Sequence, residues 1–157
     1  MQRTGIGIVL LALKLHLTVA WITVSINSPF DIDFDHYDLE MKISGVREID
    51  IHSNYAFDGH IEFTIDSSSS TFYIAMPCGS DRISNVPVPA SNERDWRMTK
   101  TSIGLSLYCD EILVGYFSKS SSSLNCLSPD QWNNFGRGLM FVDAAVTHYQ
   151  LVSTSEL

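Results

Sequence analysis

The segment Tyr37-Asp38-Leu39-Glu40-Met41-Lys42-Ile43 alternates apolar and charged residues without a break, and it decides the fold. His60-Ile61-Glu62-Phe63-Thr64-Ile65-Asp66 repeats the alternation. Successive side chains of a β-strand point to opposite faces, so each segment predicts a strand with one buried and one solvated face. Shorter runs of the same kind bring the total to about eight predicted strands: Glu48–His52, Phe72–Met76, Ile103–Leu107, Ile112–Phe117, Leu139–Val142 and Val146–Val152.

The connectors favour antiparallel pairing. Ser67–Ser70 and Asp110-Glu111 each separate two alternating segments, as hairpin turns do. Beyond the N-terminal segment, no stretch of ten or more residues has a 3.6-residue apolar period, so the crossover helices of a parallel sheet are not expected. The sequence therefore predicts an all-β chain with a single antiparallel β-sandwich or jelly-roll domain. Two long connectors are expected to be irregular, 77–100 and 118–138, and Ser120–Ser123 within the second predicts a flexible loop.

The first twenty residues have the three parts of a secretory signal peptide. Arg3 is basic, Ile6–Leu13 is apolar, and Ala20 is a small residue at the expected cleavage site. A membrane anchor is the alternative, but Lys14 interrupts an apolar run that is already shorter than the roughly 20 residues a spanning helix needs. We expect residues 1–20 to be a signal peptide and 21–157 to be one secreted extracellular domain without stable membrane insertion. Cleavage after Ser25 is the alternative to cleavage after Ala20.

The charge of the chain limits its partners. The formal net charge is −8 at pH 7, so nucleic acid and anionic membrane surfaces are not expected to bind. Ten acidic residues lie between Asp31 and Asp66, against only two basic ones, Lys42 and Arg47. Any electrostatic surface is therefore expected on the early strands.

Three cysteines, Cys78, Cys109 and Cys126, allow three different single disulfides in an oxidising compartment. We expect Cys109 to pair with Cys126, because both flank one predicted hairpin and Cys109 continues the inward face of its strand. Cys78 is then either a buried small hydrophobe or the handle of a disulfide-linked dimer.

Motifs for catalysis and metal binding are missing from the sequence. It has neither a Gly-x-Ser-x-Gly elbow nor a glycine-rich phosphate loop. Asp31–His36 resembles the start of a calcium loop, but the sixth position is His36 instead of Gly and the twelfth is Lys42 instead of Glu. The histidines of the domain lack the i, i+2 or i, i+4 spacing of a metal pair. We therefore expect no enzyme, no metal and no cofactor; a hydrolase would need strand carboxylates clustered in a cleft with raised pKa values.

Asp130-Gln131-Trp132-Asn133-Asn134-Phe135-Gly136-Arg137-Gly138 is the segment most like a binding site. An aromatic face can cover the C–H surface of a sugar while amides, a carboxylate and a guanidinium bind its hydroxyls. The candidate ligand residues are Asp130, Trp132, Asn133, Asn134 and Arg137. In the alternative, Trp132 and Phe135 close one end of the sandwich core and Arg137 pairs with a local acid.

Several features follow one another along the chain: Phe72-Tyr73-Ile74-Ala75-Met76 with Ile83 beyond it, Trp96 before Leu105 and Leu107, Glu111-Ile112-Leu113-Val114-Gly115, and Tyr149-Gln150-Leu151. From Phe63 through Leu151 this order resembles the farnesoic acid O-methyltransferase-like domain. The resemblance implies a lectin-like β-sandwich module. No S-adenosylmethionine site is visible, so methyl transfer is not expected despite the family name.

Together these features predict a secreted, non-enzymatic module that binds a glycan through its end loops. The alternative is an extracellular structural or protein-interaction domain, which would pair through an exposed sheet edge or through a Cys78 bridge.

Overall fold

The computed structural model describes residues 20–44, 48–53, 59–65, 69–88, 93–142 and 146–154. Apart from Ala20, the predicted signal peptide lies outside these residues. Within them, no helix is long and apolar enough to cross a membrane.

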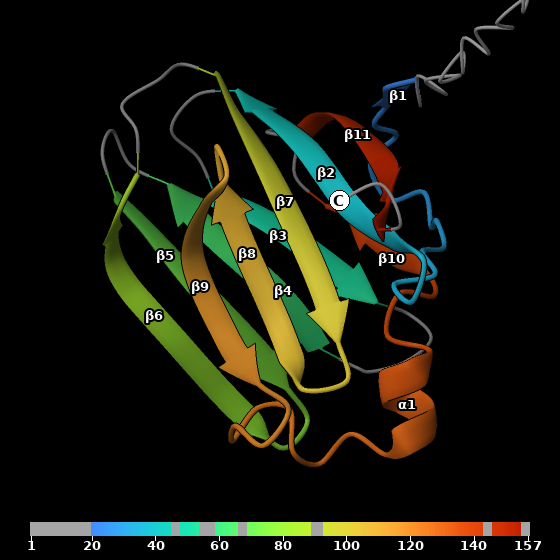
Figure 1. Cartoon of the computed structure of the whole chain (residues 1–157), viewed down its shortest axis with the longest axis vertical. Helices are drawn as coiled ribbons and strands as arrows, with labels where there is room; N and C mark the ends of the chain where they lie inside the picture. Colours follow the sequence, from blue (N-terminus) through green and yellow to red (C-terminus); the bar gives the residue numbers. More distant parts are fainter. Residues whose placement is uncertain are drawn as a thin grey trace, which may run out of the picture.

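Two antiparallel sheets pack face to face (Figure 1), which confirms the predicted all-β sandwich. The first sheet has the order β1-β11-β2-β7-β8-β9 and the second has the order β10-β3-β4-β5-β6. The strands are β1 (Ile22–Thr23), β2 (Tyr37–Ser44), β3 (Glu48–Ser53), β4 (Gly59–Ile65), β5 (Ser69–Met76), β6 (Gly79–Pro87), β7 (Glu93–Thr101), β8 (Gly104–Cys109), β9 (Ile112–Ser118), β10 (Leu139–Phe141) and β11 (Val146–Ser153). In the described residues one short α-helix, α1 (Pro129–Asn133), lies at the lower right of the sheets in Figure 1.

The prediction that 77–100 is irregular was wrong, because β6 and β7 occupy most of it. Of the two prolines in this segment, Pro87 ends β6 and Pro89 lies outside the described residues. Charged residues at buried positions hide the alternation of apolar and polar residues that would have predicted β7. Arg94 and Lys100 are 3% and 7% exposed, and they share the inward face of β7 with Trp96 and Met98.

The core lies between the two sheets and follows the predicted alternation. Leu39 and Met41 of the first sheet and Ile51 and Ile61 of the second are fully buried. The sheets pack closely at Gly115, where a side chain would collide with the Phe72 ring of the other sheet. A glycine at this point of β9 therefore sets how closely the layers pack.

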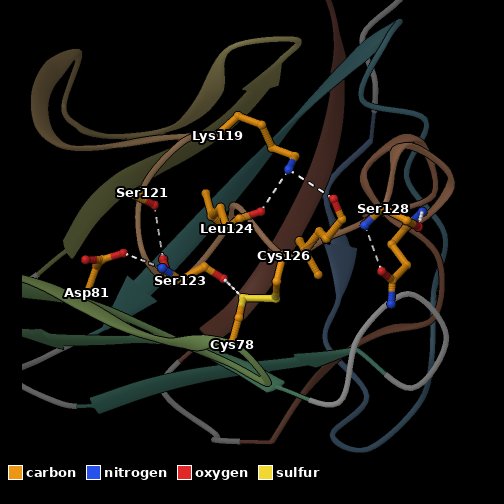
Figure 2. The surroundings of a disulfide bond; sticks show 10 residues. Cys78, Asp81, Lys119, Ser121, Ser123, Leu124, Cys126 and Ser128 are labelled. Carbon is orange, nitrogen blue, oxygen red and sulfur yellow. Dashed lines mark hydrogen bonds between the residues drawn. A yellow bond between two sulfur atoms is a disulfide. The ribbon is translucent and has the colours of Figure 1, made fainter.

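The disulfide joins Cys78 to Cys126, not Cys109 to Cys126 (Figure 2), with the two Cα atoms 5.7 Å apart. Cys78 lies in the turn between β5 and β6, and the loop after β9 folds back to reach it. Cys109 is fully buried opposite Trp96, and burial raises the pKa of its thiol to about 12. Because Cys78 is already paired, the predicted Cys78-linked dimer is corrected as well.

The serine run in this loop is held in place by Asp81 of β6 (Figure 2), contrary to the predicted flexible loop. Ser122 Oγ donates to Asp81 Oδ1 and Ser123 N donates to Oδ2, both at 2.7 Å. Hydrogen bonds from Ser123 and Ser122 lower the pKa of Asp81 to about 2. The ionised carboxylate therefore fastens the loop to the sheet.

We expect the protein to lose stability as the pH falls from about 4 to about 2, because the pKa of Asp81 is lower in the folded chain than in the unfolded chain. The contribution is present above the unfolded pKa and disappears as the carboxylate is protonated. After allowance for solvent screening, it amounts to about 1 kcal/mol. Urea unfolding at pH 7 and pH 2.5 should show a smaller difference for Asp81→Asn than for the wild type. Asp95→Asn, at an exposed aspartate, is the control, and equal pH dependence in all three proteins would contradict the assignment.

Candidate functional site

The predicted binding segment begins with the five-residue helix α1, whose start is defined by a capping box. Ser128 Oγ accepts a hydrogen bond from Gln131 N at 3.2 Å, and Ser128 N donates to Gln131 Oε1 at 2.9 Å. Pro129 occupies the first turn, where its missing N–H costs nothing. At the other end, Asn134 Nδ2 donates to the carbonyl oxygen of Asp130 at 2.9 Å. The segment is therefore a defined helix and turn.

Trp132 belongs to the core. It is 5% exposed, its indole N–H donates to the Thr101 carbonyl oxygen at 3.2 Å, and its ring centroid lies 5.3 Å from that of the fully buried Phe135. Of the two alternatives for these aromatic residues, the structure shows the one in which they close an end of the sandwich. Trp132 is therefore not available as an exposed platform for a sugar.

Two ammonium groups lie over the Trp132 ring. The Nζ atoms of Lys100 and Lys119 are 5.0 Å and 5.5 Å from the ring centroid, within range of a cation–π interaction. Lys119 also donates to the carbonyl oxygens of Leu124 and Leu127, at 2.8 Å and 3.1 Å (Figure 2). Burial lowers the pKa of Lys100. The indole thus ties β7 and the loop after β9 to α1.

In contrast to the buried Trp132, three polar residues of the predicted site line a hollow of about 370 Å³: Asn133, Asn134 and Arg137. Its other wall is the segment Asp31-Ile32-Asp33. Asp130 is not among the lining residues, and its carboxylate accepts a hydrogen bond from Asn134 Nδ2 at 3.2 Å. The volume lies at the lower end of the range for small-ligand sites, which is about 300–1,000 Å³.

Hydrogen bonds donated by main-chain N–H groups join the two walls of the hollow. Ile32 N donates to the Gly136 carbonyl oxygen at 2.8 Å, and Gly138 N donates to Asp31 Oδ1 at 2.8 Å. Any side chain at Gly136 would collide with the Ile32 carbonyl, so the close approach requires glycine there. The walls are therefore held at a fixed separation.

The wall formed by Asp31-Ile32-Asp33, the acidic wall, alternates between exposed and buried residues as the predicted strands do. Ile32 and Phe34 are 4% and 5% exposed, while Asp31 and Asp33 are exposed. A hydrogen bond from His36, together with one from Asp35 N, lowers the pKa of Asp33. The carboxylate therefore stays ionised at neutral pH and can act only as a hydrogen-bond acceptor. Sequence reasoning considered this segment for calcium but did not connect it with the 130–138 segment.

The hollow can bind a ligand rich in hydroxyl groups. Asp31 and Asp33 are acceptors, Arg137 is a donor, and the Asn133 amide is both. The Asn134 amide adds an acceptor oxygen, because its Nδ2 already donates to Asp130. In the described part of the chain, no group of three or more His, Cys, Asp or Glu residues is arranged to hold a metal ion.

No family model matches the sequence, and no curated protein sequence matches it significantly. Among solved structures, the laminarinase catalytic domain from Thermotoga maritima is 11% identical and matches with a TM-score of 0.52, over 80% of this chain and 56% of that domain. The fold is shared. Sheep galectin-11 is 7% identical and matches over 85% of this chain and 95% of its own, with a TM-score of 0.49. The Caenorhabditis elegans galectin LEC-6 is 14% identical and matches over 86% of this chain and 91% of its own, with a TM-score of 0.46. This chain thus spans little more than half of the laminarinase domain.

The laminarinase match corrects the prediction that this chain is not an enzyme. That prediction relied on missing serine-hydrolase and phosphate motifs, yet the matching structure is a catalytic domain with the same kind of sandwich. A fold by itself does not define an activity. Binding and catalysis must therefore be distinguished at the site itself.

Proposed function

We propose that this chain is a secreted saccharide-binding protein and that the hollow between Asp31–Asp33 and Asn133–Arg137 is its binding site. The proposal rests on one observation: two carboxylates, two amides and a guanidinium line one small hollow. A sugar hydroxyl both donates and accepts hydrogen bonds, so neighbouring hydroxyls are matched by mixed planar groups of this kind.

Other classes of ligand fit this hollow less well. Phosphate groups would meet the ionised Asp33, and the net charge of −8 repels polyanions over longer distances. An apolar ligand would displace water from the remaining hydrogen-bonding positions of these carboxylates and amides and would put nothing polar in its place. A neutral ligand with several hydroxyls avoids both penalties, and the volume of about 370 Å³ limits it to a short saccharide.

Secretion is supported by the disulfide. Cys78 and Cys126 are both exposed to solvent, and an exposed disulfide persists in oxidising compartments but is reduced in the cytosol. The predicted signal peptide agrees with this location. N-terminal sequencing of secreted protein tests the cleavage, and an intact Met1 on a membrane-bound product would contradict the signal peptide.

A glycan array with the mature protein should identify at least one saccharide, and Asn133→Ala and Arg137→Ala should each weaken its binding about tenfold. The estimate corresponds to one or two lost hydrogen bonds of about 1 kcal/mol each. Asn125→Ala and Arg82→Ala remove the same side-chain types at exposed positions that do not line the hollow, and should leave affinity unchanged. If all four variants bind like the wild type, the site is misassigned.

A protein-interaction domain is the second candidate, and exposed apolar side chains favour it. Ile112, Leu113 and Tyr116 of β9, the outermost strand of the first sheet, are 52%, 53% and 42% exposed. Edge strands with apolar side chains are common pairing surfaces. A dimer in light scattering would support this candidate, whereas a monomer without array binding would argue against both.

A further inference from the structure

Two histidines that are eight residues apart in sequence lie side by side on the second sheet. His52 of β3 and His60 of β4 are register partners, and their ring centroids are 5.6 Å apart with the planes inclined by 19°. Ile51 and Ile61 beside them are fully buried, so alternation places both imidazoles on the outward face. Both residues are half-buried and remain accessible from solvent.

A methionine extends this pair into a row. Met140 of β10 is the register partner of His52, and β10, β3 and β4 are neighbours in the sheet. Leu139 and Phe141 on either side of it are buried, so half-buried Met140 lies on the same outward face as the histidines. Adjacent strands are about 4.8 Å apart, so the three side chains occupy successive steps across the sheet.

A tyrosine of β5 lies next to the histidine pair, between it and an arginine of β6. Tyr73 of β5 packs against His60, with ring centroids 5.7 Å apart. The Arg82 guanidinium, from β6 on the other side of β5, lies over the Tyr73 ring, 5.1 Å from its centroid. The tyrosine ring therefore separates the guanidinium from the imidazole pair.

We propose that His52 and His60 chelate a single copper ion, with the Met140 thioether as a third and weaker ligand. Imidazole nitrogens bind copper, nickel and zinc at about 2.0–2.1 Å, and a thioether adds a preference for copper(I). The χ2 angle of histidine has a broad distribution, so rotation can bring the facing nitrogens closer than the ring centroids. This site is separate from the hollow and does not depend on the proposed saccharide binding.

Neither a sequence motif nor a larger cluster of metal-binding residues marks this histidine pair. In sequence, His52 and His60 lack the spacing of a metal motif on one strand, and only the β3–β4 register brings them together. The row holds two histidines and a methionine, so it lies outside the His, Cys, Asp and Glu groups of three or more considered above.

The test uses the untagged mature protein, stripped of metal with a chelator and titrated with copper(II) by calorimetry. We expect one copper ion per chain, with nitrogen couplings from two imidazoles in the electron paramagnetic resonance spectrum. His52→Gln and His60→Gln should each weaken binding about tenfold or more. His148→Gln, at a half-buried histidine of the other sheet, should bind like the wild type.

Met140→Leu separates the role of the thioether from that of the imidazoles. Under reducing conditions it should weaken copper(I) binding, while nickel(II) binding stays unchanged, because nickel has less preference for sulfur of this kind. The proposal is overturned if the wild-type spectrum lacks nitrogen coupling, which requires no variant to fold. It is also overturned if a folded His52→Gln, His60→Gln double variant binds copper like the wild type.

Discussion

Trp132→Ala is expected to lower the free energy of unfolding by about 3–5 kcal/mol, the usual cost of removing a large buried aromatic side chain. The substitution removes the contact with Phe135 and the hydrogen bond to Thr101. It also removes the ring that lies beneath the ammonium groups of Lys100 and Lys119. Urea unfolding followed by circular dichroism measures the loss.

Trp21→Ala is the matched control, because Trp21 is half-buried near the start of the domain and its ring contacts Lys42 Nζ at 4.7 Å. It should destabilise the protein much less. If Trp132→Ala instead kept full stability and lost only saccharide binding, the indole would be an exposed platform after all.

Replacing both Cys78 and Cys126 with Ser is expected to lower the free energy of unfolding by about 4 kcal/mol on the chain-entropy estimate. The disulfide spans 48 residues of sequence, so opening it gives the unfolded chain much more freedom. Asp81, Ser122 and Ser123 still fasten the loop, so we expect the folded structure to persist near 25 °C. Urea midpoints of the wild type and the double variant test this.

Cys109→Ala is the control for the disulfide, since it removes a thiol while leaving the bridge intact. The native wild type should also resist alkylation until it is unfolded, because burial shields Cys109 and raises the pKa of its thiol to about 12. Peptide mapping that joins Cys109 to Cys126 would contradict this pairing.

Most strands were predictable because their faces alternate between core and solvent. β2 and β4 follow the pattern at every residue quoted, and the buried face of β2 matches it. β7 was not predictable in this way, since the buried Arg94 and Lys100 at its inward positions hide the period. Local patterns report burial only when core positions carry apolar side chains.

Contacts between distant segments were the part that the sequence could not supply. The disulfide depends on how the loop after β9 folds back to the turn between β5 and β6, which follows from the packing of one sheet on the other. The hollow depends on the hydrogen bond between Ile32 and Gly136, which are about a hundred residues apart. The residue types at Asn133, Asn134 and Arg137 did indicate a polar surface, and Asp31–Asp33 was recognised as acidic, but no local pattern placed the two segments opposite each other.

The most direct test of the saccharide site is a backbone amide NMR titration of the mature domain with the saccharide selected on the array. We predict chemical-shift changes concentrated at Asp31–Asp33 and Asn133–Arg137, the two walls of the hollow. Changes confined to the β9 edge or to the outer faces of the sheets, with these amides unmoved, would contradict the proposed site.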